Sequence, residues 1–287
     1  MKIGIYVFSG TGNTARVCGL FQERLIGGGA EVVWHNMEDE YTDSVSPDKF
    51  DALIFAYPVH GFNAPTIVTQ FAEKLPKADG KPYYIVKSSG EPAKANRASS
   101  AKLNAVLKSK GYIMLDEFHY VMPYNMIFRH EQHMVDKMWR RAMEAADFDV
   151  AEVLEGRRGN IKQHARHRLI SGLFRIEHGG MRIIGRHYKV DMNKCVKCMR
   201  CVKACPVGNI EYKDGKFVFG KKCLGCARCS FNCPKDAFNI SLLNSWKVNG
   251  AYDFSLKEES DGELCKWCNK SYRRYFSRKG GNSIENQ

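Results

Sequence analysis

Long apolar segments are missing from this sequence. No run of 18 apolar residues occurs in its 287 residues, whereas a membrane-spanning helix needs about 20 such residues. The apolar start, Met1–Phe8, is too short for a secretory signal and lacks a small-residue cleavage site. We therefore expect no membrane span and no secretion, and we predict a cytoplasmic protein.

Nucleotide and nucleic-acid signatures are also missing. The sequence contains no Gly-Lys-Ser/Thr Walker loop and no complete GxGxxG dinucleotide fingerprint. Direct oxidation of NAD(P)H is therefore not expected. The net charge is +13, but the basic residues do not interleave with aromatic ones and no known nucleic-acid module is present. We expect no nucleic-acid partner.

Signals for disulfide formation are absent too, although the chain holds eleven cysteines. Disulfides are typical of secreted chains, so we expect thiols that are reduced or bound to metal. Eight cysteines form two copies of one spacing, offset by 28 residues. Two residues separate the first three cysteines, three precede the fourth, and a proline follows it. The copies are Cys195, Cys198, Cys201, Cys205 and Pro206, then Cys223, Cys226, Cys229, Cys233 and Pro234.

This spacing predicts two 4Fe–4S clusters. Three thiolates on one tight loop can bind three irons of a cubane, and in such repeats the fourth ligand comes from the other copy. Zinc is the alternative, but a zinc site needs only four ligands in paired CxxC units. The expected ligand sets are Cys195, Cys198, Cys201 and Cys233 for one cluster, and Cys223, Cys226, Cys229 and Cys205 for the other.

The cysteine segment resembles the two-cluster bacterial-type ferredoxins over about 50 residues. That resemblance implies a small α+β domain.

A second motif lies near the start of the chain. The β-rich run Lys2–Phe8 leads into a small polar loop, 9–14, and then into a helical pattern stopped by three glycines. Loop amides and a helix N-terminus can bind a phosphate without a lysine or arginine, and hydroxyls can add donors. The alternative is an ordinary glycine turn. The loop residues are Ser9, Gly10, Thr11, Gly12, Asn13 and Thr14.

Strand and helix patterns alternate through the first 125 residues. They predict an α/β fold with a doubly wound, five-stranded parallel sheet in the order 2-1-3-4-5. Ligands bind at the carboxyl ends of such strands, where the loops 9–14, 57–63 and 88–92 are expected to meet. Strands are predicted at 2–8, 30–35, 51–57, 82–88 and 112–122, and helices at 64–75, 98–110 and 131–156.

On these motifs, residues 1–125 resemble the flavodoxins, and the chain resembles flavodoxin–ferredoxin fusion proteins, which occur chiefly in anaerobes. The resemblance implies FMN with its phosphate on loop 9–14, and it places Gly61 near flavin N5. Loop 88–92 lacks the aromatic residue that many flavodoxins have there, and Tyr124 is the candidate substitute. Tyr57 and Phe62 could instead be core, and His60 an ordinary loop residue. The implied ring contacts are Tyr57, Pro58, Val59, His60, Gly61, Phe62, Ser88, Ser89 and Gly90.

Charge divides the chain unevenly. Residues 157–190 hold nine basic residues and one acidic residue, and we interpret them as a connector between a flavodoxin-like domain (1–156) and the cluster domain (191–242). The connector is either a helix packed between domains or a docking surface. As a docking surface it would bind an acidic redox protein such as a ferredoxin. An anionic membrane surface is the less favoured partner.

The rest of the chain carries weaker signals. Residues 243–287 are expected to form a partly disordered extension, with disorder at 278–287. Cys265 and Cys268 stand alone and, with Cys18, are interpreted as reduced thiols. His130 and His133 are interpreted as surface residues, and the methionines of 131–156 as core.

The expected function is electron transfer between the clusters and FMN, which links a low-potential donor to an acceptor. The alternative is a flavin-dependent reductase of a small molecule, fed by its own clusters, with His60, Tyr124 and Asn125 as lining candidates. A third interpretation is a regulatory or assembly module with a degenerate flavin site. The residues alone do not decide whether the protein is an enzyme.

Overall fold

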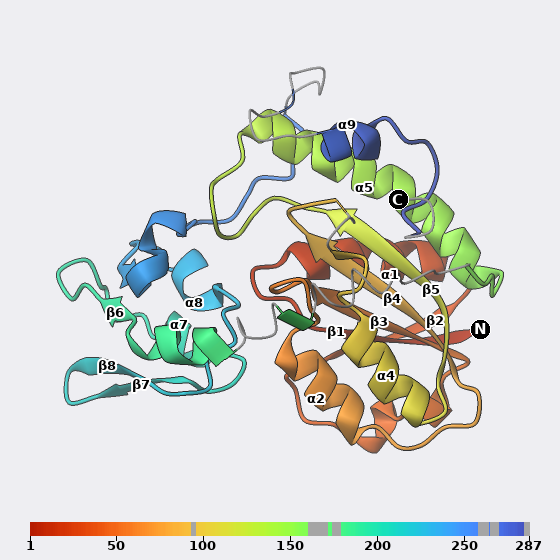
Figure 1. Ribbon diagram of the computed structural model, residues 1–287, viewed down its shortest axis with the longest axis horizontal. Helices are drawn as coiled ribbons and strands as arrows, with labels where there is room; N and C mark the ends of the chain where they lie inside the picture. Colours follow the sequence, from red (N-terminus) through yellow and green to blue (C-terminus); the bar gives the residue numbers. More distant parts are fainter. Residues whose placement is uncertain (93–95, 160–171, 174–178, 258–263, 265–269, 284–287) are drawn as a thin grey trace.

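The computed structural model describes residues 1–92, 96–159, 172–173, 179–257, 264 and 270–283. Figure 1 shows two lobes: a larger one on the right, built around a sheet, and a smaller one on the left, made of short elements. Most of the expected connector lies outside the described residues, as do Cys265 and Cys268.

A five-stranded parallel sheet forms the centre of the larger lobe, in the order β2-β1-β3-β4-β5. This is the predicted doubly wound arrangement. Each end of each strand lies within one residue of its predicted position. The strands are β1 (Lys2–Val7), β2 (Glu31–Asn36), β3 (Ala52–Pro58), β4 (Pro82–Ser89) and β5 (Ile113–Val121).

Helices cover both faces of this sheet (Figure 1). They are α1 (Asn13–Gly27), α2 (Thr66–Lys74), α4 (Ala101–Ser109) and α5 (Gln132–Leu154), with the 3-10 turns η1 (Asp43–Val45) and η2 (Pro47–Lys49). Successive strand side chains point to opposite faces. Ile3 and Ile5 therefore lie in the core with α1 and α5, whereas Tyr6 lies in the core with α2 and α4. No helix among the described residues is long and apolar enough to cross a membrane.

Helix α5 confirms one expectation and corrects another. Met134 and Met138 are fully buried, as the core interpretation predicts. His130, just before the helix, is only 5% exposed and stacks on the ring of Tyr124 with the two planes 2° apart. The surface interpretation of His130 is therefore wrong, because aromatic neighbours cover its ring.

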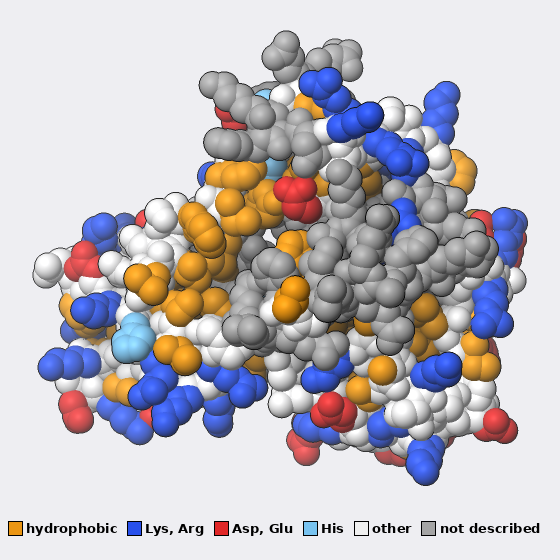
Figure 2. Space-filling model, in the orientation of Figure 1, with side chains coloured by type: hydrophobic (Ala, Val, Ile, Leu, Met, Phe, Trp, Pro, Cys, Tyr) orange, Lys and Arg blue, Asp and Glu red, His pale blue; other side chains and the backbone are white. Residues whose placement is uncertain are grey.

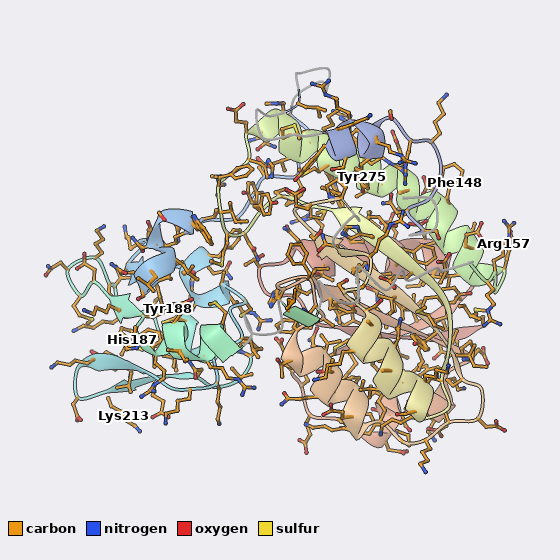
Figure 3. The ribbon with its side chains drawn as sticks, viewed as in Figure 1. Phe148, Arg157, His187, Tyr188, Lys213 and Tyr275 are labelled. Atoms are coloured by element: carbon orange, nitrogen blue, oxygen red, sulfur yellow. The ribbon has the colours of Figure 1, made fainter. Side chains whose placement is uncertain are left out.

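The end of the chain returns to the larger lobe. Helix α9 (Lys270–Phe276) lies beside α5, and Tyr275 is buried between them (Figures 1 and 3). Residue Asn282 is 1% exposed, and its N–H donates to the Asp149 carboxylate of α5 over 2.7 Å. The expected disorder is therefore wrong for 278–283, and this stretch is part of the larger lobe. Residues 284–287 lie outside the described part.

The smaller lobe has the expected α+β character. Strand β6 (Lys189–Val190) pairs with β9 (Phe238–Asn239), and β7 (Ile210–Lys213) pairs with β8 (Lys216–Phe219), both antiparallel. The short helices are α7 (Arg200–Lys203), α8 (Arg228–Phe231) and the 3-10 helix η3 (Ser241–Trp246). Helix α8 lies 28 residues after α7, so the cysteine repeat is also a structural repeat.

Candidate cofactor sites

The backbone of the cysteine repeat bends in the same way in both copies. A left-handed residue precedes each short helix, Met199 at φ 57° before α7 and Ala227 at φ 58° before α8. These bends wrap the chain tightly, so that the first three cysteines of each copy face one cavity. The spacing read from the sequence therefore corresponds to a repeated loop geometry.

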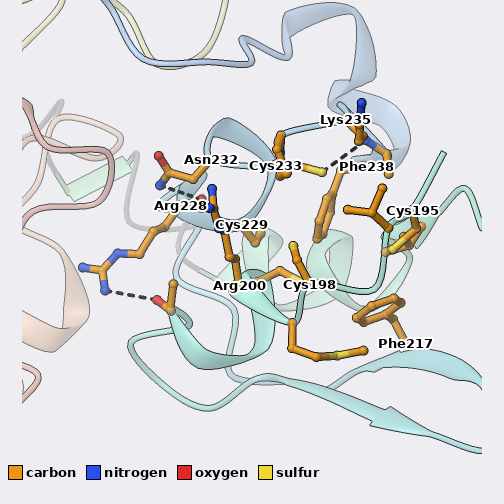
Figure 4. A pocket seen from close by; sticks show the side chains of 17 residues that line it. Cys195, Cys198, Arg200, Phe217, Arg228, Cys229, Asn232, Cys233, Lys235 and Phe238 are labelled. Carbon is orange, nitrogen blue, oxygen red and sulfur yellow. Dashed lines mark hydrogen bonds between the residues drawn. The ribbon is translucent and has the colours of Figure 1, made fainter.

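Two separate cavities are lined by cysteines, and each draws on both copies. In one cavity the fourth cysteine of the second copy lies with the first three of the first copy (Figure 4). The reverse holds for the other cavity. Cys229 lines both cavities. The outer cavity holds Cys195, Cys198, Cys201 and Cys233, and the inner cavity holds Cys205, Cys223, Cys226 and Cys229.

Backbone amides point at the crossed cysteines. The amide of Asn209 donates to Cys205 Sγ over 3.2 Å, and the amide of Ala237 donates to Cys233 Sγ over 3.3 Å. Each donor lies four residues after its cysteine. Such N–H···S bonds stabilise a thiolate and raise the reduction potential of a cluster that it ligates.

Burial also distinguishes these thiols. It raises the pKa of Cys226 to about 11 and that of Cys201 to about 11, and backbone hydrogen bonds oppose it. A thiol with such a pKa stays protonated at neutral pH unless a bound cation stabilises the thiolate. The donor set of each cavity, four cysteines on tight loops, therefore fits an iron–sulfur cluster.

The last part of the connector covers the inner cavity. A β-carbon on Gly185 would overlap Cys223 Cβ, so this backbone packs directly on the cysteine. Met181 packs in the same way over Gly225, and the buried ring of Tyr188 belongs to the same cluster of side chains. Within its described residues the connector packs on the inner cavity, and most of it lies outside the described part of the chain.

Arg228 links the inner cavity to the larger lobe. Its Nη2 donates to the Ser9 carbonyl over 2.7 Å and its Nε donates to the Gly10 carbonyl over 3.1 Å. The same guanidinium binds both carboxylate oxygens of Glu38, at 2.6 and 2.8 Å, and the Ala204 carbonyl at 3.1 Å. Figure 4 shows Arg228 pointing away from the cysteines of the outer cavity, toward the N-terminal lobe.

These contacts orient the backbone amides of loop 9–14, the candidate phosphate-binding loop. Peptide bonds are trans and planar, so when Arg228 binds the carbonyls of Ser9 and Gly10, the N–H groups of Gly10 and Thr11 point to the opposite side. In the described part of the chain, the amides of Gly10, Thr11 and Gly12 donate to no acceptor. Gly12 has φ 103° and open space around it. Three free amides on one loop fit an anion such as a phosphate.

The hydroxyls of this loop have partners within the lobe. Ser9 Oγ accepts from the Ala15 amide over 3.2 Å, and Thr11 Oγ1 accepts from Asn125 over 3.2 Å. Because both hydroxyl oxygens act as acceptors in these bonds, each O–H group can still donate a hydrogen bond to an anion. Thr14 Oγ1 lies 2.8 Å from Ser88 Oγ, which ties loop 9–14 to the end of β4.

Loop 57–63, the first of two loops expected to border the flavin ring, contains both buried and accessible residues. Tyr57 is fully buried in the core against α2 and α4, so it has the packing role that was weighed against flavin contact. Gly61 and Phe62 both have left-handed backbone, at φ 49° and 55°. These two residues form the centre of a tight turn, in which the His60 amide donates to the Asn63 carbonyl over 2.9 Å. Phe62 and His60 are half-buried and can contact a ligand.

The ring of Tyr124 covers loop 88–92, the second loop expected to border the flavin ring. A β-carbon on Gly90 would overlap the Tyr124 ring, and Tyr124 OH donates to Glu91 Oε1 over 2.7 Å. His130 lies behind this ring, and burial lowers its pKa to about 4, so the imidazole is neutral. Tyr124 therefore places an aromatic ring against loop 88–92, and its contact with a flavin stays a prediction.

Comparison with known families decides the nature of the smaller lobe. Residues 188–211, which include the four cysteines of the first copy, match the family described as 4Fe-4S binding domain. The larger lobe has the strand order of flavodoxins. The chain joins a flavodoxin-like domain to a ferredoxin-type domain.

Solved structures are similar to the flavodoxin-like domain at low identity. A flavodoxin of Streptococcus pneumonia TIGR4 is 20% identical, covering 54% of this chain and 97% of its own, with a TM-score of 0.38. The two-electron reduced flavodoxin of Megasphaera elsdenii is 22% identical, covering 42% and 85%, with a TM-score of 0.36. An NADH:FMN oxidoreductase in its apo form is 15% identical, covering 61% and 89%, with a TM-score of 0.35. Comparison with curated proteins gives no match.

Sequence reasoning missed the residues that connect the two domains. Arg228 of the ferredoxin-type domain and Glu38 of the flavodoxin-like domain form an ion pair with little exposure to solvent. The repeat places an arginine before the third cysteine of both copies, Arg200 and Arg228. That pattern marks the position but does not show that only the second arginine reaches the other domain.

Proposed function

We propose that this chain is an electron-transfer protein in which two 4Fe–4S clusters exchange electrons with FMN. One observation carries the proposal. Arg228, which lies between two cysteines of the inner cavity, binds the backbone of the loop suited to the flavin phosphate. In this proposal the inner cluster and the flavin site are therefore neighbours in one molecule.

The residues have distinct roles in this proposal. The outer and inner cysteine sets hold one cluster each, the amides of loop 9–14 bind the FMN phosphate, and loops 57–62 and 88–90 border the ring. Tyr124 covers one side of the ring site. When bound, the clusters supply one-electron steps and FMN supplies one- or two-electron steps.

Covalent linkage explains why the two domains share a chain. Each transfer between cluster and flavin becomes intramolecular, at an effective concentration that separate proteins do not reach. Reduced thiols and clusters require a reducing compartment, so the proposal places the protein in the cytoplasm.

Cofactor content tests the proposal. Protein purified without oxygen should contain about eight irons, eight sulfides and one FMN per chain, because each 4Fe–4S cluster has four of each. Zinc in place of iron, or protein without flavin, would overturn the assignment.

The small-molecule reductase receives less support. Asn125 binds Thr11 and Tyr124 OH binds Glu91, so two of its three lining candidates hold loops together. Reductant-dependent turnover of a small molecule at rates above those with protein acceptors would favour the reductase.

A further inference from the structure

The two cysteine cavities differ in their access to solvent. The inner cavity is covered by the backbone of Gly185 on one side and by Gly10 of the flavodoxin-like domain on another. In the outer cavity, Cys198 is exposed. An electron that enters or leaves by collision with another protein therefore has its shortest path at Cys198.

The surface around Cys198 has an apolar centre and a basic rim. Val196, which lines the outer cavity, is 56% exposed. Lys194, Lys197 and Lys235 are exposed beside it. None of these three ammonium groups has an ion pair within the described residues. We refer to Lys194, Val196, Lys197, Cys198 and Lys235 as the Cys198 face.

The nearby acidic residues do not neutralise this face. Glu211 pairs with Lys213, and Asp236 pairs with Lys247 at 2.6 Å. Asp191, three residues before Lys194, accepts from the Asn193 amide over 3.0 Å and is one carboxylate against three lysines. Figure 2 shows blue side chains outnumbering red ones over the smaller lobe. The positive charge around Cys198 is therefore left for a partner.

We propose that the Cys198 face is the docking site of an acidic redox protein. An exposed apolar centre within a charged rim is the arrangement of a transient protein interface, where complementary charge steers the encounter. One electron passes from the reduced centre of the partner to the cluster of the outer cavity, and no bond forms or breaks. The inference rests on the proposed function, and it replaces the connector with the Cys198 face as the docking surface.

Charge reversal tests the site. The probe is a reduced, acidic two-cluster ferredoxin, mixed with the holoprotein at low salt. K194E/K197E should react about tenfold more slowly than wild type, because steering of this kind raises association rates by 10-fold or more. At about 0.5 M salt the rates should converge, because screening removes the attraction. K197E/K235E is a second variant, should the first fail to load its clusters.

The matched control reverses two charges elsewhere. K102E/K108E changes exposed lysines of α4 and lowers the net charge by the same amount. It should react like wild type. Equal loss of rate in the control and in the Cys198-face variants would overturn the docking site, since only net charge would then matter.

Two further measurements separate the remaining outcomes. Photoreduced 5-deazariboflavin, which is uncharged, should reduce the clusters and then the flavin at equal rates in all variants. Flavin that stays oxidised in every protein would contradict the proposed function and not the docking site alone. Binding to vesicles with 30% phosphatidylserine that K194E/K197E abolishes, with an unchanged ferredoxin rate, would overturn the acidic partner in favour of a membrane surface.

Discussion

The carbonyl oxygen of Cys226 lies 2.6 Å from the point where a β-carbon on Gly10 would stand. A cluster-ligand loop and the candidate phosphate loop are therefore in contact, and only glycine permits the approach. Arg228 holds the two loops together through three hydrogen-bonded groups of the flavodoxin-like domain. The proposed path from cluster to flavin depends on this contact, and the first two predictions test it.

Gly10→Ala should separate the two loops. Its methyl group meets backbone that has no flexible end to move aside, so the domains must shift apart. We expect electron transfer from clusters to flavin to slow by about tenfold or more, equivalent to about 1.4 kcal/mol in the barrier. Stopped-flow reduction gives this rate. Gly19→Ala is the control, since a β-carbon there meets nothing within 4 Å. An unchanged rate in Gly10→Ala would contradict the contact path.

Arg228→Gln should weaken FMN binding. The variant loses the hydrogen bonds to the Ser9 and Gly10 carbonyls, so the loop amides are no longer oriented toward a phosphate. Hydrogen bonds to charged groups contribute about 1.5–3 kcal/mol each, and we expect a roughly tenfold to hundredfold higher Kd for FMN. Quenching of flavin fluorescence measures it, on protein with its clusters intact.

The repeat supplies the control for that variant. Arg200 has the same place in the first copy but is exposed, so Arg200→Gln should leave the Kd for FMN as in wild type. Arg228→Lys should not restore binding, because a lysine lacks the planar fork that binds several acceptors. Equal Kd values for Arg228→Gln and wild type would remove the role of Arg228 in the phosphate site.

The elements of the flavodoxin-like domain follow closely from local sequence. The continuous apolar run of β3 indicates a buried strand because it is too short for a typical helix and is bounded by turn or polar residues. The cysteine spacing likewise determines the loop geometry of the ferredoxin-type domain. These signals are local, so they can be read without knowledge of the fold.

Contacts that leave no spacing pattern in the sequence could not be read in that way. The C-terminal tail is short and polar at 278–283, yet Asn282 docks on Asp149 and Tyr275 fills a gap beside α5. His130 becomes buried only because Tyr124 and Phe128 pack on it. Asn282 and Tyr275 meet partners that are far along the chain, and His130 meets only the faces of neighbouring rings. Neither kind of contact produces a spacing pattern in the sequence.

Docking of the C-terminal tail should depend on pH. Burial raises the pKa of Asp149 to about 7, whereas the unfolded value is about 3.9. The folded state therefore favours the protonated form, so this contribution to stability is complete below about pH 4 and is lost as the pH rises through 7. The slope is at most about 1.4 kcal/mol per pH unit.

Asp149→Asn should remove that pH dependence, because its carbonyl can still accept from the Asn282 amide. Denaturant unfolding between pH 4 and 8 gives the free energy of unfolding for both proteins. A difference between them that stays constant with pH would contradict the assignment to Asp149.

A buried ion pair stabilises the end of β4 beneath loop 88–92. Lys87 and Glu117 are both fully buried, and Lys87 Nζ also donates to the Asn96 carbonyl over 2.8 Å. Glu117→Gln leaves the lysine without its counter-charge, and such changes cost about 3–5 kcal/mol. Denaturant unfolding should show this loss, and Lys87→Met/Glu117→Gln should recover much of it. A cost below about 1 kcal/mol in Glu117→Gln would show that the pair contributes little.

The most direct test of the whole account is rapid reduction of the holoprotein, followed at wavelengths for the clusters and for the flavin. The account predicts that the clusters bleach first and the flavin follows, with a second rate that does not change with protein concentration. A flavin that stays oxidised beside reduced clusters, or one reduced at a rate proportional to protein concentration, would contradict it.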